Sequence, residues 1–378
     1  MRVVMLSKAL VHAAYHQKCV ELAALPGIEL TVLVPSAWRE PRVGEQRLEL
    51  RHSEQYQIQV LPIRLNGQHH LHYYPTIGRV LRALRPDIAH IDEEAFNAAT
   101  AHAMHHGRAV GARCCFFNWA NIARWYPPPF SWFERAVFRM ATHGIAGNHE
   151  AAALIRSHGY DGPLTIIPQF GVDPVRFAPR QRQPREHFTI GYVGRLVAEK
   201  GVADLIAALA LLPAHCHLLI VGDGVERAAL QQAAQSAGVA ARVAFQASVP
   251  SATMPEVYHR CDVLVVPSRT TTGWKEQFGR VIIEAMSCGV PVIGSSSGEI
   301  PRVIDDAGLI VAEGAPAELA AALRRLATTP ALASDLAQRG RARVLAQYTQ
   351  RAIAQATAEV YAAMRDAPIP PVPGTPPG

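Results

Sequence analysis

Residues 189–212 read TIGYVGRLVAEKGVADLIAALALL, and they decide how the second half of the chain folds. The first five residues form an apolar run typical of a buried strand, and the last eleven have the apolar spacing of a helix. Gly194 and Gly201 bound the turn between them, where glycine permits tight turns and close backbone approach. This order of strand, turn and helix predicts one unit of a parallel sheet.

The same alternation extends outward along the whole chain. Strands are expected at residues 2–6, 29–35, 87–91, 113–117, 144–147, 164–168, 189–193, 218–221 and 262–268, and helices at residues 9–24, 315–327, 330–347 and 349–363. The pattern predicts an α/β protein with two doubly wound parallel sheets. In such sheets, ligands bind where the carboxyl ends of the strands meet.

Two turns at these strand ends carry groups suited to phosphate. Arg195 and Lys200 offer a planar fork and a point charge to a diphosphate. A second glycine-containing turn, Gly222-Asp223-Gly224, follows the next strand. Taken alone, an arginine and a lysine in a turn are most often solvated surface charges, so this pattern gains weight only from what surrounds it.

Residues 276–286 read EQFGRVIIEAM and set two carboxylates eight positions apart. The helical part is apolar except for Glu284, so it must lie against a core, and its carboxylate needs a hydrogen-bonding partner. Glu276 precedes the helix in a loop, so the two groups are expected to address different parts of one ligand. The helix N terminus between them favours phosphate and comprises Gly279, Arg280 and Val281. The alternative is a surface glutamate and a salt-bridged helix glutamate.

Together these segments resemble the large group 1 (family 4) type of retaining glycosyltransferases, which have the two-domain GT-B fold. The resemblance covers the second half of the chain nearly end to end and the first half in outline. The motifs that carry it are Gly194-Arg195, Lys200-Gly201, Gly222-Asp223-Gly224, Pro267-Ser268, Glu276 with Phe278-Gly279, Glu284-Ala285-Met286, Gly289-Val-Pro291 and Gly298-Glu299-Ile-Pro301.

The resemblance implies two Rossmann-like domains facing each other across a cleft. The N-terminal, acceptor-side domain would comprise residues 1–172 and the nucleotide-sugar-binding domain residues 173–348. A crossover helix at residues 349–365 would pack back on the first domain. The proline-rich residues 366–378 are expected to form a disordered tail.

The implied activity is transfer of a sugar from a nucleotide-diphosphate sugar to an acceptor, with retention of anomeric configuration. Charge that develops on the leaving phosphate must be stabilised by fixed positive groups. Here these would be Arg195, Lys200 and the helix N terminus, with no metal and no other cofactor, and no Asp-x-Asp sequence occurs. Glu284 would bind the ribose hydroxyls and Glu276 the donor sugar. The expected catalytic residues are Glu276, Lys200 and Arg195, and the expected donor contacts are Gly194, Gly222, Val249, Gln277, Phe278, Gly279, Arg280, Val281 and Glu284.

The first domain departs from the family pattern. Its first loop lacks the usual glycines, so Lys8 is a candidate substitute at the donor phosphates. Asn118 to Asn121 stand where many relatives carry a histidine. The acidic residues 92–94 could position the acceptor, bind a metal or cap a helix starting near Ala95, whereas the histidines at 69, 70 and 72 are expected in a surface loop. The candidate acceptor-side residues are Asp92, Glu93, Glu94, Asn118, Asn121 and Lys8.

Residues 118–135 interleave three tryptophans with arginines. Residues 1–180 also carry 19 Lys and Arg against 14 Asp and Glu. This pattern suits a membrane interface, a lipid-linked acceptor or stacking on sugar rings, and the alternative is a loop that anchors a core helix. The expected acceptor is therefore a polysaccharide, a lipid-linked glycan or another cell-envelope glycan. Nucleic acid is not expected, because no nucleic-acid motif accompanies the modest charge.

Composition sets the cellular context. The 378 residues, 49% of them hydrophobic, suffice for two packed cores. No apolar run approaches the roughly 20 residues that span a bilayer, and the amino terminus lacks the pattern of a secretion signal. A cytoplasmic protein is expected, at the inner face of the membrane if residues 118–135 contact it. The six cysteines include no Cys-x-x-Cys pair and predict reduced structural thiols.

Two other classes of function compete with sugar transfer. A nicotinamide-dependent oxidoreductase uses a similar sheet, but no Gly-x-Gly-x-x-Gly follows a strand here. A non-catalytic nucleotide-sugar-binding protein on the same scaffold would be expected to have lost a phosphate-binding cation or a glutamate. The chain retains all four such residues, which favours an enzyme. UDP-, GDP- and ADP-sugars all remain candidate donors.

Overall fold

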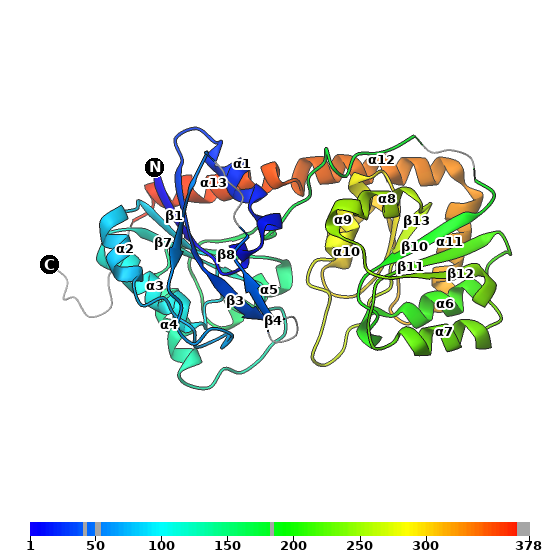
Figure 1. Cartoon of the computed structure of the whole chain (residues 1–378), viewed down its shortest axis with the longest axis horizontal. Coiled ribbons are helices and arrows are strands. Elements are labelled where there is room, and N and C mark those ends of the chain that lie inside the picture. Colours follow the sequence, from blue (N-terminus) through cyan, green and yellow to red (C-terminus); the bar gives the residue numbers. More distant parts are fainter. Residues whose placement is uncertain (41–43, 50–53, 182–184, 369–378) are drawn as a thin grey trace. The chain divides into compact units, whose positions relative to one another are not determined.

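The computed structural model describes residues 1–40, 44–49, 54–181 and 185–368, and the chain folds as two compact units (Figure 1). The first unit comprises Met1–Phe170 and Gln350–Gly378, and the second comprises Gly171–Thr349. The sequence places these boundaries at residues 172 and 349. Residues 369–378, most of the expected proline-rich tail, lie outside the described residues.

The first unit is built on a seven-stranded sheet with the order β5-β2-β1-β6-β7-β8-β9, in which every neighbouring pair is parallel. The central strands are buried on both faces, as expected for a parallel sheet covered by helices. The order reverses between β1 and β6, so a crevice opens at their carboxyl ends. The strands are β1 (Arg2–Leu6), β2 (Glu29–Pro35), β5 (Gln57–Leu61), β6 (Ile88–Ile91), β7 (Arg113–Asn118), β8 (His143–Ala146) and β9 (Leu164–Ile166). A separate antiparallel pair joins β3 (Ala37–Glu40) to β4 (Gly44–Arg47).

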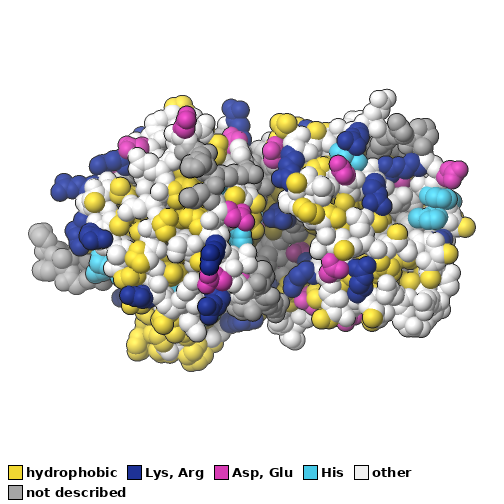
Figure 2. Space-filling view, in the orientation of Figure 1, with side chains coloured by type: hydrophobic (Ala, Val, Ile, Leu, Met, Phe, Trp, Pro, Cys, Tyr) yellow, Lys and Arg dark blue, Asp and Glu magenta, His cyan; other side chains and the backbone are white. Residues whose placement is uncertain are grey.

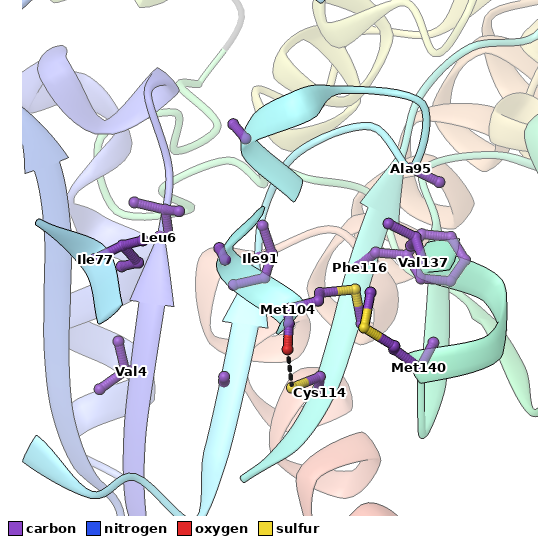
Figure 3. Close-up of a cluster of buried hydrophobic side chains, with 14 of the residues drawn as sticks. Val4, Leu6, Ile77, Ile91, Ala95, Met104, Cys114, Phe116, Val137 and Met140 are labelled. Atoms are coloured by element: carbon purple, nitrogen blue, oxygen red, sulfur yellow. Dashed lines mark hydrogen bonds between the residues drawn. The ribbon is translucent and has the colours of Figure 1, made fainter. Parts of the chain in front are cut away.

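Helices cover both faces of this sheet. One face packs against α2 (Ile77–Leu84), α3 (Ala98–Ala109), α4 (Phe130–Met140) and α5 (His149–Ser157). Figure 3 shows this core, where Phe116 of β7 lies near Val137 and Met140 of α4. The Sγ of Cys114 donates a weak hydrogen bond to the carbonyl of Met104 on α3 (Figure 3).

The other face of the sheet is covered by α1 (Gln17–Ala23) and by the last helix, α13 (Gln350–Asp366). Figure 1 shows α13, in red, lying beside α1. Tyr361 on α13 is fully buried, and its hydroxyl lies 2.7 Å from Nδ1 of His90 on β6. Burial lowers the pKa of His90 to about 4, so this contact joins two neutral groups at pH 7.

The helix expected at residues 9–24 does not form as one element. Two 3-10 turns at Ala9–Val11 and Ala13–Tyr15 precede α1, and His12 between them has an extended backbone. The main-chain N–H of Ala13 donates to the carboxylate of Glu49, and Nε2 of His16 lies 2.7 Å from the carbonyl of Leu10. These tertiary and local contacts replace the helical hydrogen bonds, so the helical pattern in the sequence is overridden.

The second unit repeats the same sheet order, β12-β11-β10-β13-β14-β15, again with parallel neighbours throughout. The order reverses between β10 and β13, which places a second crevice at their carboxyl ends. The strands are β10 (Phe188–Val193), β11 (Cys216–Val221), β12 (Val243–Gln246), β13 (Val263–Val266), β14 (Val292–Ser295) and β15 (Leu309–Val311). The helices are α6 (Val202–Ala210), α7 (Arg227–Ser236), α8 (Met254–His259), α9 (Arg280–Ser287), α10 (Ile300–Ile304), α11 (Pro316–Thr328) and α12 (Pro330–Gln347).

Both cores are apolar and hold the cysteine side chains. All six cysteines are buried, and none of them forms a disulfide. Among the described residues, no helix combines the length and hydropathy needed to cross a bilayer.

Candidate functional site

Main-chain hydrogen bonds join the ends of strands β10 and β11 in the second unit. The N–H of Gly194, after β10, donates to Val221 at 3.0 Å, and the N–H of Leu196 donates to Asp223 at 2.9 Å. Gly222 has φ 146°, and a Cβ there would lie 1.9 Å from the carbonyl oxygen of Gly194. Only glycine permits this approach. The turn that follows β10 therefore packs directly against the turn that follows β11.

Lys200, in the segment that follows β10, forms an ion pair with Glu276. Lys200 ends a 3-10 turn after β10, and its Nζ lies 2.5 Å from Oε2 of Glu276, in the loop after β13. The same oxygen accepts a hydrogen bond from Ser268 Oγ at 2.9 Å. The two charged side chains are only 18% and 10% exposed. The ring of Trp274 lies over the ammonium, 4.7 Å from its centroid.

Two glycines fix the main chain around this pair. Gly298 has φ +53°, and a Cβ there would come within 2.1 Å of the Glu276 carbonyl oxygen. That carbonyl accepts a hydrogen bond from the N–H of Glu299 at 3.0 Å. Gly201 has φ +65°, and its Cβ would lie 2.0 Å from the carbonyl oxygen of Pro267. The motif glycines therefore allow the strand ends to pack closely enough to bring Lys200 to Glu276.

Helix α9 begins immediately after this loop. Gly279, with φ +75°, is its N-cap residue and has no side chain to cap the helix. The N terminus of a helix favours an anion. Phe278, which precedes the cap, packs edge-on against Tyr348 with 5.6 Å between ring centroids.

Glu284, one turn into α9, has its own partners. Its Oε2 accepts a hydrogen bond from the Tyr258 hydroxyl at 2.6 Å, and its Oε1 lies 3.1 Å from Nε of Arg280. Burial raises the pKa of Glu284, while Arg280 and Tyr258 oppose that shift. The structure thus supplies the partner that the sequence requires, and it gives the two glutamates different surroundings. Arg280, a predicted donor contact, lies with its half-exposed side chain against Glu284.

The remaining predicted donor contacts lie around the same crevice. Arg195 is exposed, and its carbonyl accepts a hydrogen bond from Tyr192 at 2.7 Å. Val249 follows Ser248, whose N–H and hydroxyl donate to the Asp223 carboxylate at 2.8 and 2.9 Å. Gln277 and Val281 flank the α9 N terminus and are partly buried.

The first unit carries a comparable pair at its own crevice. Lys8, after β1, forms an ion pair with Glu93, after β6, and its ammonium lies 5.3 Å from the ring centroid of Trp38. His72 is fully buried, and its Nε2 lies 3.5 Å from Glu93 Oε1. The expectation of a surface loop is therefore wrong for His72, because its ring packs against Trp38 and Tyr74 as well as Glu93.

Glu94 differs from its neighbour because no cation among the described residues lies at hydrogen-bonding distance from its carboxyl group. Its Oε1 accepts from the main-chain N–H of Trp119 at 3.0 Å, and its buried Oε2 has no hydrogen-bond partner in the described part of the chain. Burial raises the pKa of Glu94 to about 7, although that N–H and Lys8 oppose the shift. Burial would also raise the pKa of Glu93, but Lys8 and His72 outweigh it and lower that pKa to about 2.

The other candidates of the acceptor side have structural partners. Asp92 Oδ2 accepts from Ser7 Oγ at 2.8 Å and from Gln169 Nε2 at 3.1 Å. Asn118 Oδ1 accepts from the N–H of Ala95 at 3.0 Å, and Asn121 Nδ2 donates to Glu150 at 3.1 Å.

Two roles considered for residues 92–94 receive no support. The nearest helix, α3, begins at Ala98 with Asn97 as N-cap, and none of the three carboxylates caps it. Within residues 1–40, 44–49, 54–181 and 185–368, no three His, Cys, Asp or Glu side chains are placed to hold a metal ion.

Residues 118–135 are split between the core and the surface. Trp119 packs over Gly147, where a Cβ would lie within 1.8 Å of its ring. Trp125 and Trp132 are instead 82% and 61% exposed. Figure 2 shows hydrophobic side chains gathered at the lower edge of the first unit, where α4 lies in Figure 1. Packing against the protein interior therefore accounts for Trp119 but not for the two exposed rings.

Sequence reasoning gave no role to several residues of these sites. Ser268 belongs to the Pro267-Ser268 motif, but the hydrogen bond from its hydroxyl to Glu276 depends on the fold and could not be predicted from the sequence. Trp274 is the only tryptophan after residue 132 in the sequence, and it stands two positions before Glu276. That proximity was the one sequence feature that could have indicated a role at the site. Tyr258 lies 26 positions from Glu284 and could not be paired with it from the sequence.

Comparison with known proteins agrees with this architecture. The family model "Glycosyl transferases group 1" matches residues 176–343, and the model "Glycosyltransferase Family 4" matches residues 15–176. Glycogen synthase of Mycobacterium tuberculosis is 29% identical over 311 residues, covering 75% of this chain and 70% of that protein. D-inositol 3-phosphate glycosyltransferase of Streptomyces bingchenggensis is 30% identical over 257 residues, covering 61% and 55%.

Solved structures share the fold at lower identity. Sucrose-phosphate synthase from Thermosynechococcus elongatus superposes with a TM-score of 0.70 at 22% identity, covering 96% of this chain and 99% of that one. Anabaena HepE in complex with UDP gives 0.72 at 17% identity, covering 96% and 100%. With two family models that together span residues 15–343 and this shared architecture, the chain belongs to the group 1 glycosyltransferases of GT-B fold.

Proposed function

We propose that this glycosyltransferase moves a sugar from a nucleoside-diphosphate sugar to a glycan acceptor, with retention of anomeric configuration and without a metal ion. The observation that carries the proposal is the Lys200–Glu276 pair, held between closely packed strand ends beside the N terminus of α9. A cation, a carboxylate and a helix N terminus together suit a ligand with a diphosphate and a sugar.

The leaving diphosphate is the centre of the proposed chemistry. As the bond between the sugar and the phosphate breaks, negative charge develops on the phosphate oxygens, and preorganised cations stabilise that charge. Lys200 is held almost out of solvent, where its charge acts in a lower dielectric than in water. Arg195 is exposed on the same turn and supplies a second cation. These groups do the work that a divalent ion does in other enzymes.

The two glutamates take different parts of the donor. Glu284 lies in α9 with one oxygen held by Tyr258 and the other near Arg280, and it accepts hydrogen bonds from the ribose hydroxyls. Glu276 positions the donor sugar and is not a nucleophile. The acceptor attacks on the face that the diphosphate leaves, and a phosphate oxygen takes its proton, which gives retention.

The donor class is supported by the relatives and by a structural neighbour. A D-inositol 3-phosphate glycosyltransferase and a glycogen synthase are among the similar proteins, and Anabaena HepE has been solved with UDP-glucose. A nucleoside-diphosphate hexose is therefore the proposed donor.

The acceptor is proposed to bind the first unit near residues 92–94. Glu94 has a buried oxygen without a described partner, and Phe96 and Tyr126 stack nearby with 4.3 Å between ring centroids. Carboxyl groups and aromatic faces are the groups that hold sugar hydroxyls and sugar rings. The exposed Trp125 and Trp132 extend this surface and suit an acceptor that carries a lipid at a membrane interface.

A donor screen tests the proposal. The chain is mixed in turn with UDP-, GDP- and ADP-glucose, -mannose and -N-acetylglucosamine, and unfolding is followed by thermal shift. A donor at 100 times its Kd adds about 2.7 kcal/mol to stability. Stabilisation should vanish in Lys200→Ala and persist in Arg325→Ala, which removes the same charge from the exposed end of α11.

Turnover separates an enzyme from a binding protein on the same scaffold. Release of the nucleoside diphosphate from the stabilising donor should proceed with time and accelerate with added glycan acceptors. Product analysis by NMR then gives the anomeric configuration. Binding of a donor without any release, in the presence of every acceptor tried, would favour the non-catalytic alternative.

A further inference from the structure

The loop that joins β13 to Glu276 is held at its start and at its tip. At its start, Arg269 pairs with Asp204, and the hydroxyl of Thr270 donates to Glu313 at 2.7 Å. Its tip is closed by hydrogen bonds between the main chains of Thr271 and Trp274, at 2.8 and 3.4 Å. The loop therefore presents the Trp274 indole from a fixed backbone.

The indole contacts the ammonium of Lys200. Its ring centroid lies 4.7 Å from Nζ, and the Glu276 carboxylate lies 2.5 Å from the same nitrogen. The face of an indole carries negative electrostatic potential, so both neighbours attract the cation. The lysine stem has four rotatable carbons, and the carboxylate alone would leave the ammonium free to move around it.

We infer that Trp274 is a positioning residue that fixes the Lys200 ammonium beside Glu276, at the place where the donor diphosphate is bound. This inference rests on the proposed function and adds a specific residue to it. The indole acts through Lys200, and it sets where the cation stands before the donor arrives.

The first test is a double-mutant cycle on turnover. Trp274→Leu should lower kcat about tenfold, because a lost cation–π contact at a poorly solvated site is of that size, while KM for the donor changes less. Trp274→Phe keeps an aromatic face and should retain activity within about threefold. In a Lys200→Ala background, Trp274→Leu should cause no further loss.

The second test uses fluorescence. The other four tryptophans, at positions 38, 119, 125 and 132, all belong to the first unit, so the difference between the wild type and Trp274→Phe isolates the indole of the second unit. UDP, GDP and ADP are titrated separately. The diphosphate that binds should draw the ammonium toward its phosphates and change the Trp274 emission, and that change should be absent in Lys200→Ala.

The outcomes separate the inference from the proposed function. If Lys200→Ala is impaired but Trp274→Leu is silent, or if its loss is the same in both backgrounds, the inference falls and the proposed function stands. If Lys200→Ala is itself fully active, both fall. Melting temperatures of the variants, matched to the wild type, ensure that the losses belong to the site.

Discussion

The adjacent glutamates Glu93 and Glu94 should give stability changes that differ in their dependence on pH when each is replaced by glutamine. Burial raises the pKa of Glu94 from 4.5 to about 7, so the native state keeps its proton over a range where the unfolded chain has lost it. Glu94 therefore costs stability as pH rises from 4.5 through about 7. The pKa of Glu93 is lowered to about 2 by Lys8 and His72 against the effect of burial. Glu93 therefore contributes stability above pH 4.5 that is lost as pH falls toward 2.

The magnitudes follow from these pKa values. Between pH 5.5 and pH 8, the cost of Glu94 in the wild type grows by about 2 kcal/mol. Glu94→Gln removes that cost, so its stability relative to the wild type should rise by the same amount over this range. Glu93 is ionised in the native and unfolded states across the range, so Glu93→Gln should be destabilised by an amount that does not change with pH.

Urea unfolding at pH 5.5 and pH 8 measures both effects. The experiment is done in a Trp274→Phe background, where every remaining tryptophan lies in the first unit with the two glutamates. Fluorescence then reports that unit alone. The reasoning is refuted if the stability difference between Glu94→Gln and its parent is the same at both pH values, since Glu94 then does not titrate in this range.

Four further predictions concern the donor site. Lys200→Ala should slow turnover, measured by nucleotide release, roughly a hundredfold or more, whereas the control Arg325→Ala should turn over at the wild-type rate. A loss of only a few fold in Lys200→Ala would show that Lys200 does not belong to the site. A chelator should leave the transfer rate unaltered, and loss of rate that magnesium or manganese restores would direct attention to residues 92–94. Glu284→Gln should weaken binding of the bare nucleoside diphosphate in calorimetry, because a charge-assisted hydrogen bond is roughly twice as strong as a neutral one. Glu276→Gln should lose turnover but bind the diphosphate at least as well as the wild type, because the substitution releases Lys200 from its ion pair. If Glu276→Gln weakens binding of the diphosphate and Glu284→Gln does not, the roles of the two glutamates are assigned wrongly.

Much of the architecture could be predicted because most strands of these sheets are short and apolar, and β8, β10 and β11 are each followed directly by a glycine. Strands buried on both faces read as continuous apolar runs, and β1, β2 and β10 show this plainly. Strand β5 could not be recognised in the same way, because its sequence QIQVL belongs to a sheet edge and leaves most of its side chains partly or fully exposed.

The candidate site residues could be predicted only where a single sequence motif indicated both their place at a strand end and their chemical role. Lys200 and Glu276 follow strands whose order in the sheet brings their ends together, so their meeting could be anticipated. His72 could not be, because a histidine-rich segment looks like a surface loop until the fold sets Glu93 beside it. The unequal surroundings of residues 92–94 likewise arise from Lys8 and Trp119, which lie far from them in sequence.

The path of the chain has a consequence for its synthesis. The second unit is one uninterrupted segment, whereas the first unit needs α13, which is made after the second unit, to cover the face of its sheet that holds Tyr361. When the end of α12 leaves the ribosome, the helices and strands of the second unit are all available, but the first unit still lacks α13. We therefore expect the second unit to be able to fold before the first is complete, with the first unit exposing apolar surface to chaperones until α13 emerges.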